Sequence, residues 1–316
     1  MNSPDTTDTT DITDITDTAP DAPTSRPWTD ITGPVPDLRL VVPDMDGTLL
    51  NGDDEVPDSF WGLLPELRRR GIMVVPASGR QYATLHGMFA SHGIRTFICE
   101  NGTLVVHDDD VVSTSPLDSP TVERIIDIVR TGESSRNTGL VVCGPQRAYV
   151  ERDDEAFITE AHRYYRSLEV VPNLHTVPEI EAGTVLKCAV FDFDSAAQAA
   201  AALFTGGGPG VADLRSGAGG GPGHQVVVSG RNWIDIMNGA ANKGRALRAL
   251  EMSLGVPRSG VAVFGDYLND LEMMAEGDWS FAMGNGHGAV QRAARFIAPR
   301  NTDEGVVQVL RRLLGV

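Results

Sequence analysis

Several residue patterns that mark common protein classes are missing from this chain of 316 residues. The three cysteines, Cys99, Cys143 and Cys188, are widely spaced and include no CxxC pair, which predicts neither a disulfide framework nor a zinc site. The seven histidines form no HExxH pattern, so zinc chemistry has little support. No run of about 18 apolar residues is present, and the N-terminus lacks an apolar signal region. We therefore expect a cytoplasmic protein without membrane attachment.

Basic residues are scarce relative to acidic ones. The chain has 26 lysines and arginines against 43 aspartates and glutamates, which gives a formal net charge of −17. An acidic chain repels nucleic acid and anionic lipid, so neither is an expected partner. Phosphate esters are repelled in the same way, so such a substrate would need local positive charge or a metal ion. The sequence does not indicate an oligomeric state.

The N-terminal part of the chain divides into a tail and the first half of a core. Residues 1–36 repeat Asp and Thr and then become proline-rich, a composition that predicts a disordered acidic tail. From Leu38 onwards, short apolar runs such as LRLVV and IMVVPA alternate with helical patterns. Strands separated by helices of this length predict right-handed βαβ units and a parallel sheet.

The middle of the chain carries more strand-like runs than helices, namely GLVVCG, AYVER, VLKCAVFDFD, QVVVSG and WIDIM. This balance predicts an antiparallel sheet with helices on one face. The glycine-rich stretch Gly206–Gly223 predicts a flexible loop, since it has no Lys or Thr at the spacing of a phosphate-binding loop. We therefore predict an α/β fold: a Rossmann-like parallel-sheet core of residues 37–107 and 239–316, with an inserted α+β cap of residues 108–238.

Acidic side chains follow two apolar strands at their carboxyl ends, where open α/β sheets bind ligands. VVPDMDGTLL places Asp44 and Asp46 after one strand, and VAVFGD presents Asp266, followed by Asn269 and Asp270. Residues i and i+2 of a strand share a side, so Asp44 and Asp46 repel each other unless a cation lies between them or one keeps a proton. Mg²⁺ is the natural cation for such oxygen ligands. The alternatives are a solvated turn for the pair and a first-turn helix acid for Asp270.

Groups that could bind a phosphate follow two other elements. IMVVPA ends in Ser78-Gly79-Arg80, where a hydroxyl and free backbone N–H groups at a helix start form an anion site. The alternative for Ser78 is an ordinary helix N-cap. Lys243 begins a helix, which opposes the helix dipole unless the side chain points at an anion. The FDFD run repeats the paired spacing at Asp192 and Asp194 without Gly-Thr, and we expect surface acids there.

These motifs together resemble the haloacid dehalogenase superfamily, and closely its Cof-type phosphatases, which carry a large α/β cap between the second and third motifs. The four motifs occur in the order expected: DMDGTL from Asp44, ASGR from Ala77, Lys243, and GDYLND from Gly265. The turn ENG at Asn101 and the run AMGNG at Gly284 are also similar to the family. The resemblance covers about residues 38–316, and the cap is matched only by position and size.

The resemblance implies a Mg²⁺-dependent phosphatase that acts on a small phosphorylated metabolite, such as a sugar phosphate or a phosphorylated cofactor. Asp44 would be the nucleophile that forms an aspartyl-phosphate, and Asp46 the general acid and base. The ion would be held by the Asp44 carboxylate, the Asp46 backbone carbonyl and Asp266, with Asp270 assisting. The groups implied to hold the phosphoryl oxygens are Ser78, Gly79, Lys243 and Asn269.

Two other functions share these features. A phosphomutase of the phosphomannomutase type also carries D-x-D-G-T and a similar cap, but the Gly-Asp-x-x-Asn-Asp motif favours the phosphatase. A non-catalytic binding or regulatory module with the same fold is disfavoured because no motif residue is missing. Three cap cations, Arg147, Arg152 and Lys187, are expected to be surface charges, and Pro43 is expected to end the hydrogen bonding of its strand.

Overall fold

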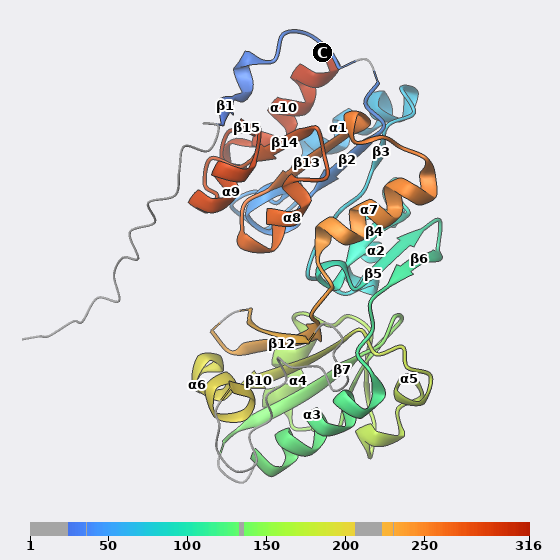
Figure 1. The fold of residues 1–316 in the computed structure, drawn as a ribbon, viewed down its shortest axis with the longest axis vertical. Coiled ribbons are helices and arrows are strands. Elements are labelled where there is room, and N and C mark those ends of the chain that lie inside the picture. The colour runs from blue at the N-terminus through green and yellow to red at the C-terminus, as the bar shows by residue number, and fades with distance from the viewer. Residues whose placement is uncertain (1–24, 36, 133–135, 206–222, 230) are drawn as a thin grey trace, which may run out of the picture.

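The computed structural model describes residues 25–316, apart from residues 36, 133–135, 206–222 and 230. Figure 1 shows one body that contains the first and last described parts of the chain, and a second body built from its middle part. Among the helices of these described residues, none combines the length and apolar character needed to span a lipid bilayer.

The core sheet is parallel throughout, as predicted, with the strand order β1-β15-β14-β13-β2-β3. Its side chains alternate between two apolar layers, since Val41 packs with one cluster and Leu40 and Val42 with the other. The strands are β1 (Arg26–Pro27), β2 (Leu40–Pro43), β3 (Met73–Val74), β13 (Val261–Gly265), β14 (Trp279–Ala282) and β15 (Phe296–Ile297).

Helices cover both faces of this sheet. One layer contains apolar residues of α1 (Asp58–Arg69), α2 (Tyr82–Phe89) and α10 (Gly305–Leu314). The opposite layer contains apolar residues of α7 (Lys243–Leu254), α8 (Leu271–Met274) and α9 (Gly288–Ala293). A core with parallel strands and helices on both faces is the predicted Rossmann-like arrangement.

A small antiparallel sheet continues the edge of the core sheet. It consists of β4 (Thr96–Cys99), β5 (Leu104–His107) and β6 (Asp110–Thr114). Ala77 forms isolated parallel bridges to both Asp44 and Ile98, and so joins β2 to β4 beyond the end of β3. The carboxyl ends of these strands therefore meet at one edge.

The cap sheet has the order β11-β12-β10-β7-β8-β9 and is antiparallel except for the β8–β9 pair. This confirms the predicted antiparallel cap, although β9 was not predicted. The strands are β7 (Thr138–Cys143), β8 (Ala148–Val150), β9 (Leu168–Val170), β10 (Lys187–Asp192), β11 (His224–Val228) and β12 (Trp233–Asn238).

The expectation that the cap helices lie on one face is wrong for α4 (Glu155–His162). Apolar residues of α3 (Ser119–Gly132), α5 (Pro178–Glu181) and α6 (Ala196–Ala200) pack together on one face of the sheet. Phe157 of α4 packs on the other face, where an added Cβ on Gly139 would come within 2.2 Å of its ring. The strands are apolar on both faces, so both can accept a helix.

The predicted tail extends too far along the chain. Residues 25–35 pack on the core: β1 pairs with β15, and the Val35 backbone N–H donates to the Leu313 carbonyl at 2.8 Å. Ile31 and Val35 are buried and belong to an apolar cluster of the core. Residues 1–24, and the predicted loop over residues 206–222, lie outside the described part of the chain.

The expectation that Pro43 ends the hydrogen bonding of its strand is also wrong. The Pro43 carbonyl accepts from the Ala77 backbone N–H at 2.9 Å, and the next residue, Asp44, donates its N–H to the Phe264 carbonyl at 2.9 Å. Strand pairing thus continues on both sides through Asp44, because Pro43 lacks only a donor and its carbonyl still serves the neighbouring strand. The backbone of Asp44 is thereby fixed between two strands.

Candidate active site

Asp44 and Asp266 stand at the carboxyl ends of the adjacent strands β2 and β13. After Asp44 the chain turns sharply through Met45–Leu49, with Gly47 at a φ of 77°. A Cβ at Gly47 would lie 2.3 Å from Asp266 Oδ2, so glycine is needed here for both its conformation and its size. Thr48 Oγ1 donates to Asp266 Oδ1 at 3.1 Å and orients that carboxylate.

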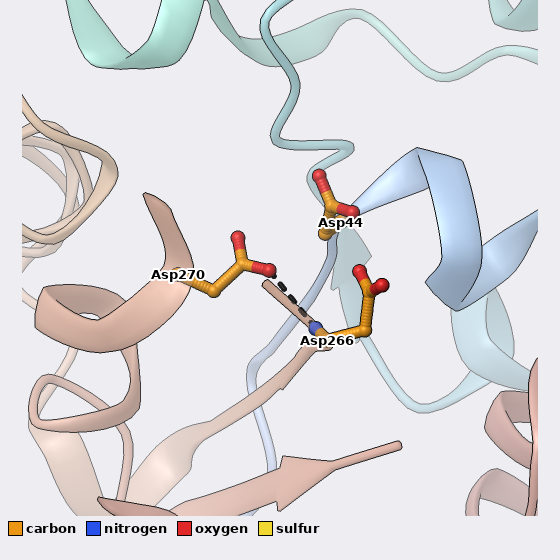
Figure 2. A group of neighbouring side chains, drawn as sticks. All are labelled: Asp44, Asp266 and Asp270. Carbon is orange, nitrogen blue, oxygen red and sulfur yellow. Dashed lines mark hydrogen bonds between the residues drawn. The ribbon is translucent and has the colours of Figure 1, made fainter. Parts of the chain in front are cut away.

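Three carboxylates converge at this edge of the sheet (Figure 2). Asp44, Asp266 and Asp270 each offer an oxygen, and these atoms all lie within 4.8 Å of one another. Asp270 Oδ2 accepts from the backbone N–H groups of Asp266 at 3.0 Å and Tyr267 at 3.2 Å. Asp270 therefore holds the backbone beside Asp266 in place.

Lys243, the first residue of α7, reaches into the same group. Its Nζ donates to Asp44 Oδ1 and, at 2.7 Å, to Asp270 Oδ1, and the side chain is fully buried. Burial alone would lower the pKa of Lys243, but Asp270 and Asp44 outweigh burial and raise it above its usual value. The lysine thus stays charged, and its anionic partners explain its position at a helix N-terminus.

One ammonium group does not balance three carboxylates. Burial, reinforced by Asp270, raises the pKa of Asp44 well above its usual range, although Lys243 opposes the shift. Burial and Asp270 likewise raise the pKa of Asp266 to about 6. A hard divalent cation would relieve this repulsion, and the donor set consists of oxygen atoms only. The residues present therefore fit Mg²⁺.

Asp46 lies outside the group of three carboxylates but lines the same cleft. Its carboxylate accepts from Arg80 Nε at 3.1 Å and also from Arg80 Nη2. Strand alternation does not place Asp46 beside Asp44, because the chain leaves the extended conformation at Met45. Sequence reasoning assigned no role to Arg80, which stands directly after two predicted phosphate-binding residues.

The other predicted phosphate-binding residues gather around Asn101. Asn101 donates its backbone N–H to the Ser78 carbonyl at 3.0 Å, and its side-chain Oδ1 accepts from Asn269 Nδ2 at 3.1 Å. A Cβ on Gly79 would lie 3.1 Å from the Asn101 amide. Asn101 has a φ of 55°, a conformation that Asn tolerates better than most residues. The ENG turn was the sequence signal for this residue, whose role was not assigned.

A cleft of about 650 Å³ opens from these residues toward the cap. Core side chains form one wall and cap side chains the other. The lining residues are Asp44, Asp46, Ser78, Gly79, Arg80, Gln81, Thr84, Asn101, Asp266, Tyr267 and Asn269 from the core, and Glu160, Arg163, Tyr164, Tyr165, Lys187, Phe191, Ser229, Arg231, Asn232, Trp233 and Asp235 from the cap.

Two expected surface charges of the cap are buried. Lys187 is 4% exposed and lies 2.6 Å from Glu100 Oε2 of the core and 3.3 Å from Asp235 Oδ1. Asp192 is fully buried and accepts from Arg136 Nε at 2.7 Å. Composition could not reveal these partners, which are distant in sequence. Arg147 pairs with Glu169, and Arg152 pairs with Asp154. The side chains of both arginines are at least partly exposed.

Known proteins are similar to this chain over most of its length. A family model described as haloacid dehalogenase-like hydrolase matches residues 41–310. The chain is 29% identical over 282 residues to 5-amino-6-(5-phospho-D-ribitylamino)uracil phosphatase YbjI of Escherichia coli, which covers 88% of this chain and 96% of that protein. It is also 26% identical over 248 residues to the HMP-PP phosphatase of Cronobacter sakazakii, which covers 78% of this chain and 84% of that protein.

Solved structures share the fold. SMU.1108c from Streptococcus mutans superposes with a TM-score of 0.70 at 24% identity, over 88% of this chain and all of that one. A haloacid dehalogenase-like hydrolase from Bacteroides thetaiotaomicron gives a TM-score of 0.71 at 20% identity, over 87% and 99% of the two chains. Core and cap are therefore both present in these relatives.

Proposed function

The chain belongs to the haloacid dehalogenase-like hydrolases, as a phosphatase of the Cof type, and from this premise we propose that it hydrolyses a small phosphorylated metabolite through an aspartyl-phosphate on Asp44, with Mg²⁺ as cofactor. The observation that carries the proposal is the fixed group of Asp44, Asp266 and Asp270 around Lys243 at the floor of the cleft.

Asp44 has the position and partners that a nucleophile needs. Lys243 Nζ donates to Asp44 Oδ1, which leaves Oδ2 to attack the phosphorus. The new bond joins Asp44 to phosphorus while the bond from phosphorus to the alcohol oxygen breaks. Asp46, which lines the same cleft, gives a proton to that oxygen. Dividing hydrolysis into two displacements replaces one difficult step with two easier ones.

The second displacement regenerates the enzyme. Asp46, now ionised, accepts a proton from water as the water oxygen attacks phosphorus, and the bond between phosphorus and Asp44 breaks. Inorganic phosphate leaves, and both aspartates return to their starting states. Ser78, Gly79, Lys243 and Asn269 are proposed to hold the phosphoryl oxygens during both steps, because positioning and charge stabilisation dominate phosphoryl transfer.

The cofactor would be held by the Asp44 carboxylate, the Asp46 backbone carbonyl and Asp266. Asp270 would assist indirectly, since both of its oxygens already accept hydrogen bonds. When bound, Mg²⁺ supplies positive charge that offsets the repulsion between a phosphate dianion and the carboxylates.

The substrate is proposed to be a phosphorylated metabolite of modest size, such as a sugar phosphate or a phosphorylated cofactor. The names of two relatives support this range, because one acts on a phosphoribitylamino-uracil and the other on HMP-PP. A cytoplasmic location is proposed as well, because Cys99, Cys143 and Cys188 are free and buried.

The test is hydrolysis of p-nitrophenyl phosphate by the full chain, with Mg²⁺ and with EDTA. We expect turnover that requires Mg²⁺ and returns when the metal is restored after chelation. A folded protein, verified by circular dichroism, that shows no Mg²⁺-dependent turnover of this ester or of a panel of phosphorylated metabolites would refute the proposed function.

A further inference from the structure

The cap presents one face of two paired strands to the cleft. Phe191 of β10 lies opposite Trp233 of β12 in the antiparallel register, and Ala189 lies opposite Asp235. Lys187 precedes Ala189 by two residues and so shares its face. Lys187, Phe191, Trp233 and Asp235 all line the cleft, at the wall opposite the catalytic carboxylates.

Aromatic rings surround this part of the wall. The ring of Trp233 packs edge to face against Phe191, Tyr164 and Tyr165, with centroid distances of 5.0, 5.5 and 5.9 Å. Phe191, Tyr165 and Trp233 are buried, so this part of the wall is apolar, whereas Tyr164 is exposed. An electrostatic interaction made beside the buried rings is therefore stronger than the same interaction in solvent.

Asp235 is a buried acidic group of this wall, which also contains Glu160, Arg163 and Arg231. It is 7% exposed, and Lys187 Nζ lies 3.3 Å from its Oδ1. Lys187 is shared, however, and its shorter contact, 2.6 Å, is with Glu100 of the core. Burial opposes the charge of Lys187, but Asp235 and Glu100 outweigh burial and raise its pKa well above the usual value. The ammonium group of Lys187 therefore pairs with two carboxylates. Of Lys187, Glu100 and Asp235, only Asp235 belongs to the same strand as Trp233.

We propose that Asp235 binds the leaving group of the substrate and sets the substrate preference. The preferred substrates are phosphate esters of neutral alcohols that are rich in hydroxyl or amino donors. Esters with an anionic group at the end remote from the phosphate are disfavoured. This inference rests on the proposed phosphatase function. A donor on the substrate gains a charge-assisted hydrogen bond from the carboxylate, whereas a second anion at the same place is repelled by it. Trp233 packs against the carbon skeleton beside that donor.

The test compares two open-chain six-carbon esters, glucitol 6-phosphate and 6-phosphogluconate, which differ by a hydroxymethyl group in place of a carboxylate. The third substrate, p-nitrophenyl phosphate, has no hydroxyl donors. In the wild-type protein we expect kcat/KM to favour glucitol 6-phosphate over 6-phosphogluconate by about tenfold or more, as one charge-assisted contact implies. Asp235→Asn keeps the shape of the side chain and removes its charge. It should bring this ratio close to one and change kcat/KM for p-nitrophenyl phosphate less than threefold.

Asp194→Asn is the matched control, since Asp194 is an exposed acid of the cap that does not line the cleft. It should leave all three rates unchanged. If Asp235→Asn lowers all three values equally, its role is structural and the inference is overturned. An unchanged ratio overturns it too, as does turnover of p-nitrophenyl phosphate without turnover of either six-carbon ester. A wild-type protein inactive on every ester refutes the phosphatase function itself, which is a distinct result.

Discussion

The side-chain amide of Gln81 forms two hydrogen bonds with the backbone of Ser167. Gln81 Nε2 donates to the Ser167 carbonyl at 3.1 Å, and the Ser167 N–H donates to Gln81 Oε1 at 3.1 Å. Gln81 directly follows the Ser78-Gly79-Arg80 turn, whereas Ser167 follows Tyr164 and Tyr165 in the cap wall of the cleft. Gln81 is 2% exposed, so the pair is shielded from water. The loop proposed to bind phosphate is thereby joined directly to the cap.

Gln81→Leu should therefore raise KM for larger substrates more than it changes the free energy of unfolding of the core. Leucine leaves the Ser167 N–H without its partner, whereas the Ser167 carbonyl still accepts from the Ala148 N–H at 2.8 Å. The loss costs about 1–3 kcal/mol and favours separation of the cap. We expect KM for the best metabolite substrate to rise roughly tenfold. Gln308→Leu is the control, because Gln308 donates to the Asp303 carbonyl at an exposed site of α10. Steady-state kinetics that do not distinguish the two variants would contradict a link between loop and cap.

Gly47→Ala should inactivate the enzyme through its effect on Asp266. The added methyl group would meet Asp266 Oδ2 at 2.3 Å, so the carboxylate must move. We expect kcat/KM to fall by about 100-fold, which corresponds to roughly 3 kcal/mol, and the rise in Tm produced by Mg²⁺ to disappear.

Gly33→Ala is the control that distinguishes the steric clash with Asp266 from backbone strain. Gly33 also has a positive φ, 86°, but an added Cβ there would meet nothing within 4 Å. Both substitutions lose the conformational freedom of glycine, at a cost of about 1 kcal/mol in unfolding free energy. Gly33→Ala should retain its activity and its Mg²⁺-dependent rise in Tm. Equal losses in both variants would show that strain, and not displacement of Asp266, is responsible.

Local chemistry explains why much of the core could be predicted from the sequence. Apolar runs followed by Asp44 or Asp266 specify strands that end in carboxylates, and parallel pairing brings such ends together regardless of loop detail. Lys243 was recognised because a lysine is unfavourable at a helix N-terminus without an anion, and its Nζ donates to two of them.

What the sequence did not reveal depends on partners that are distant along the chain and on the direction of one turn. Lys187 was expected at the surface because composition alone cannot reveal Glu100 and Asp235 as partners. Asp46 was expected beside Asp44 because the two-residue period of a strand was applied to a turn. Arg80 was missed as the partner of Asp46 for the same reason, since its role depends on where that turn points.

Asp44→Asn should abolish turnover without unfolding the protein. An amide is a poor nucleophile, so kcat should fall by roughly 10³-fold or more. Burial and Asp270 raise the pKa of Asp44, which means that its ionised form is costly in the folded state. Removal of the charge should therefore leave Tm in EDTA unchanged or higher. Asp194→Asn serves as the control for the loss of one acid, and near wild-type kcat in Asp44→Asn would show that the nucleophile is misassigned.

Glu251 of α7 should make the protein less stable as pH rises, whereas a carboxylate in an ion pair makes a protein more stable as pH rises. It is 6% exposed, and within the described residues its Oε1 has no hydrogen-bond partner. Burial, followed by the charge of Glu276, raises the pKa of Glu251 from its usual 4.5 to about 7. Between these two pKa values the folded state binds more protons than the unfolded state. The free energy of unfolding therefore falls as pH rises from 4.5 to 7, and the contribution of Glu251 to it is constant above pH 7.

Glu251→Gln should remove this contribution and stabilise the protein at pH 8 by on the order of 2 kcal/mol, because the neutral amide carries no desolvation cost for charge. Below pH 4.5 the variant and the wild type should have similar stability, since Glu251 is then protonated in both states. The measurement is urea unfolding at intervals between pH 4 and 8, with the exposed Glu272→Gln of α8 as the control. If the difference between Glu251→Gln and wild type is the same at every pH, the raised pKa of Glu251 is not what limits stability at neutral pH.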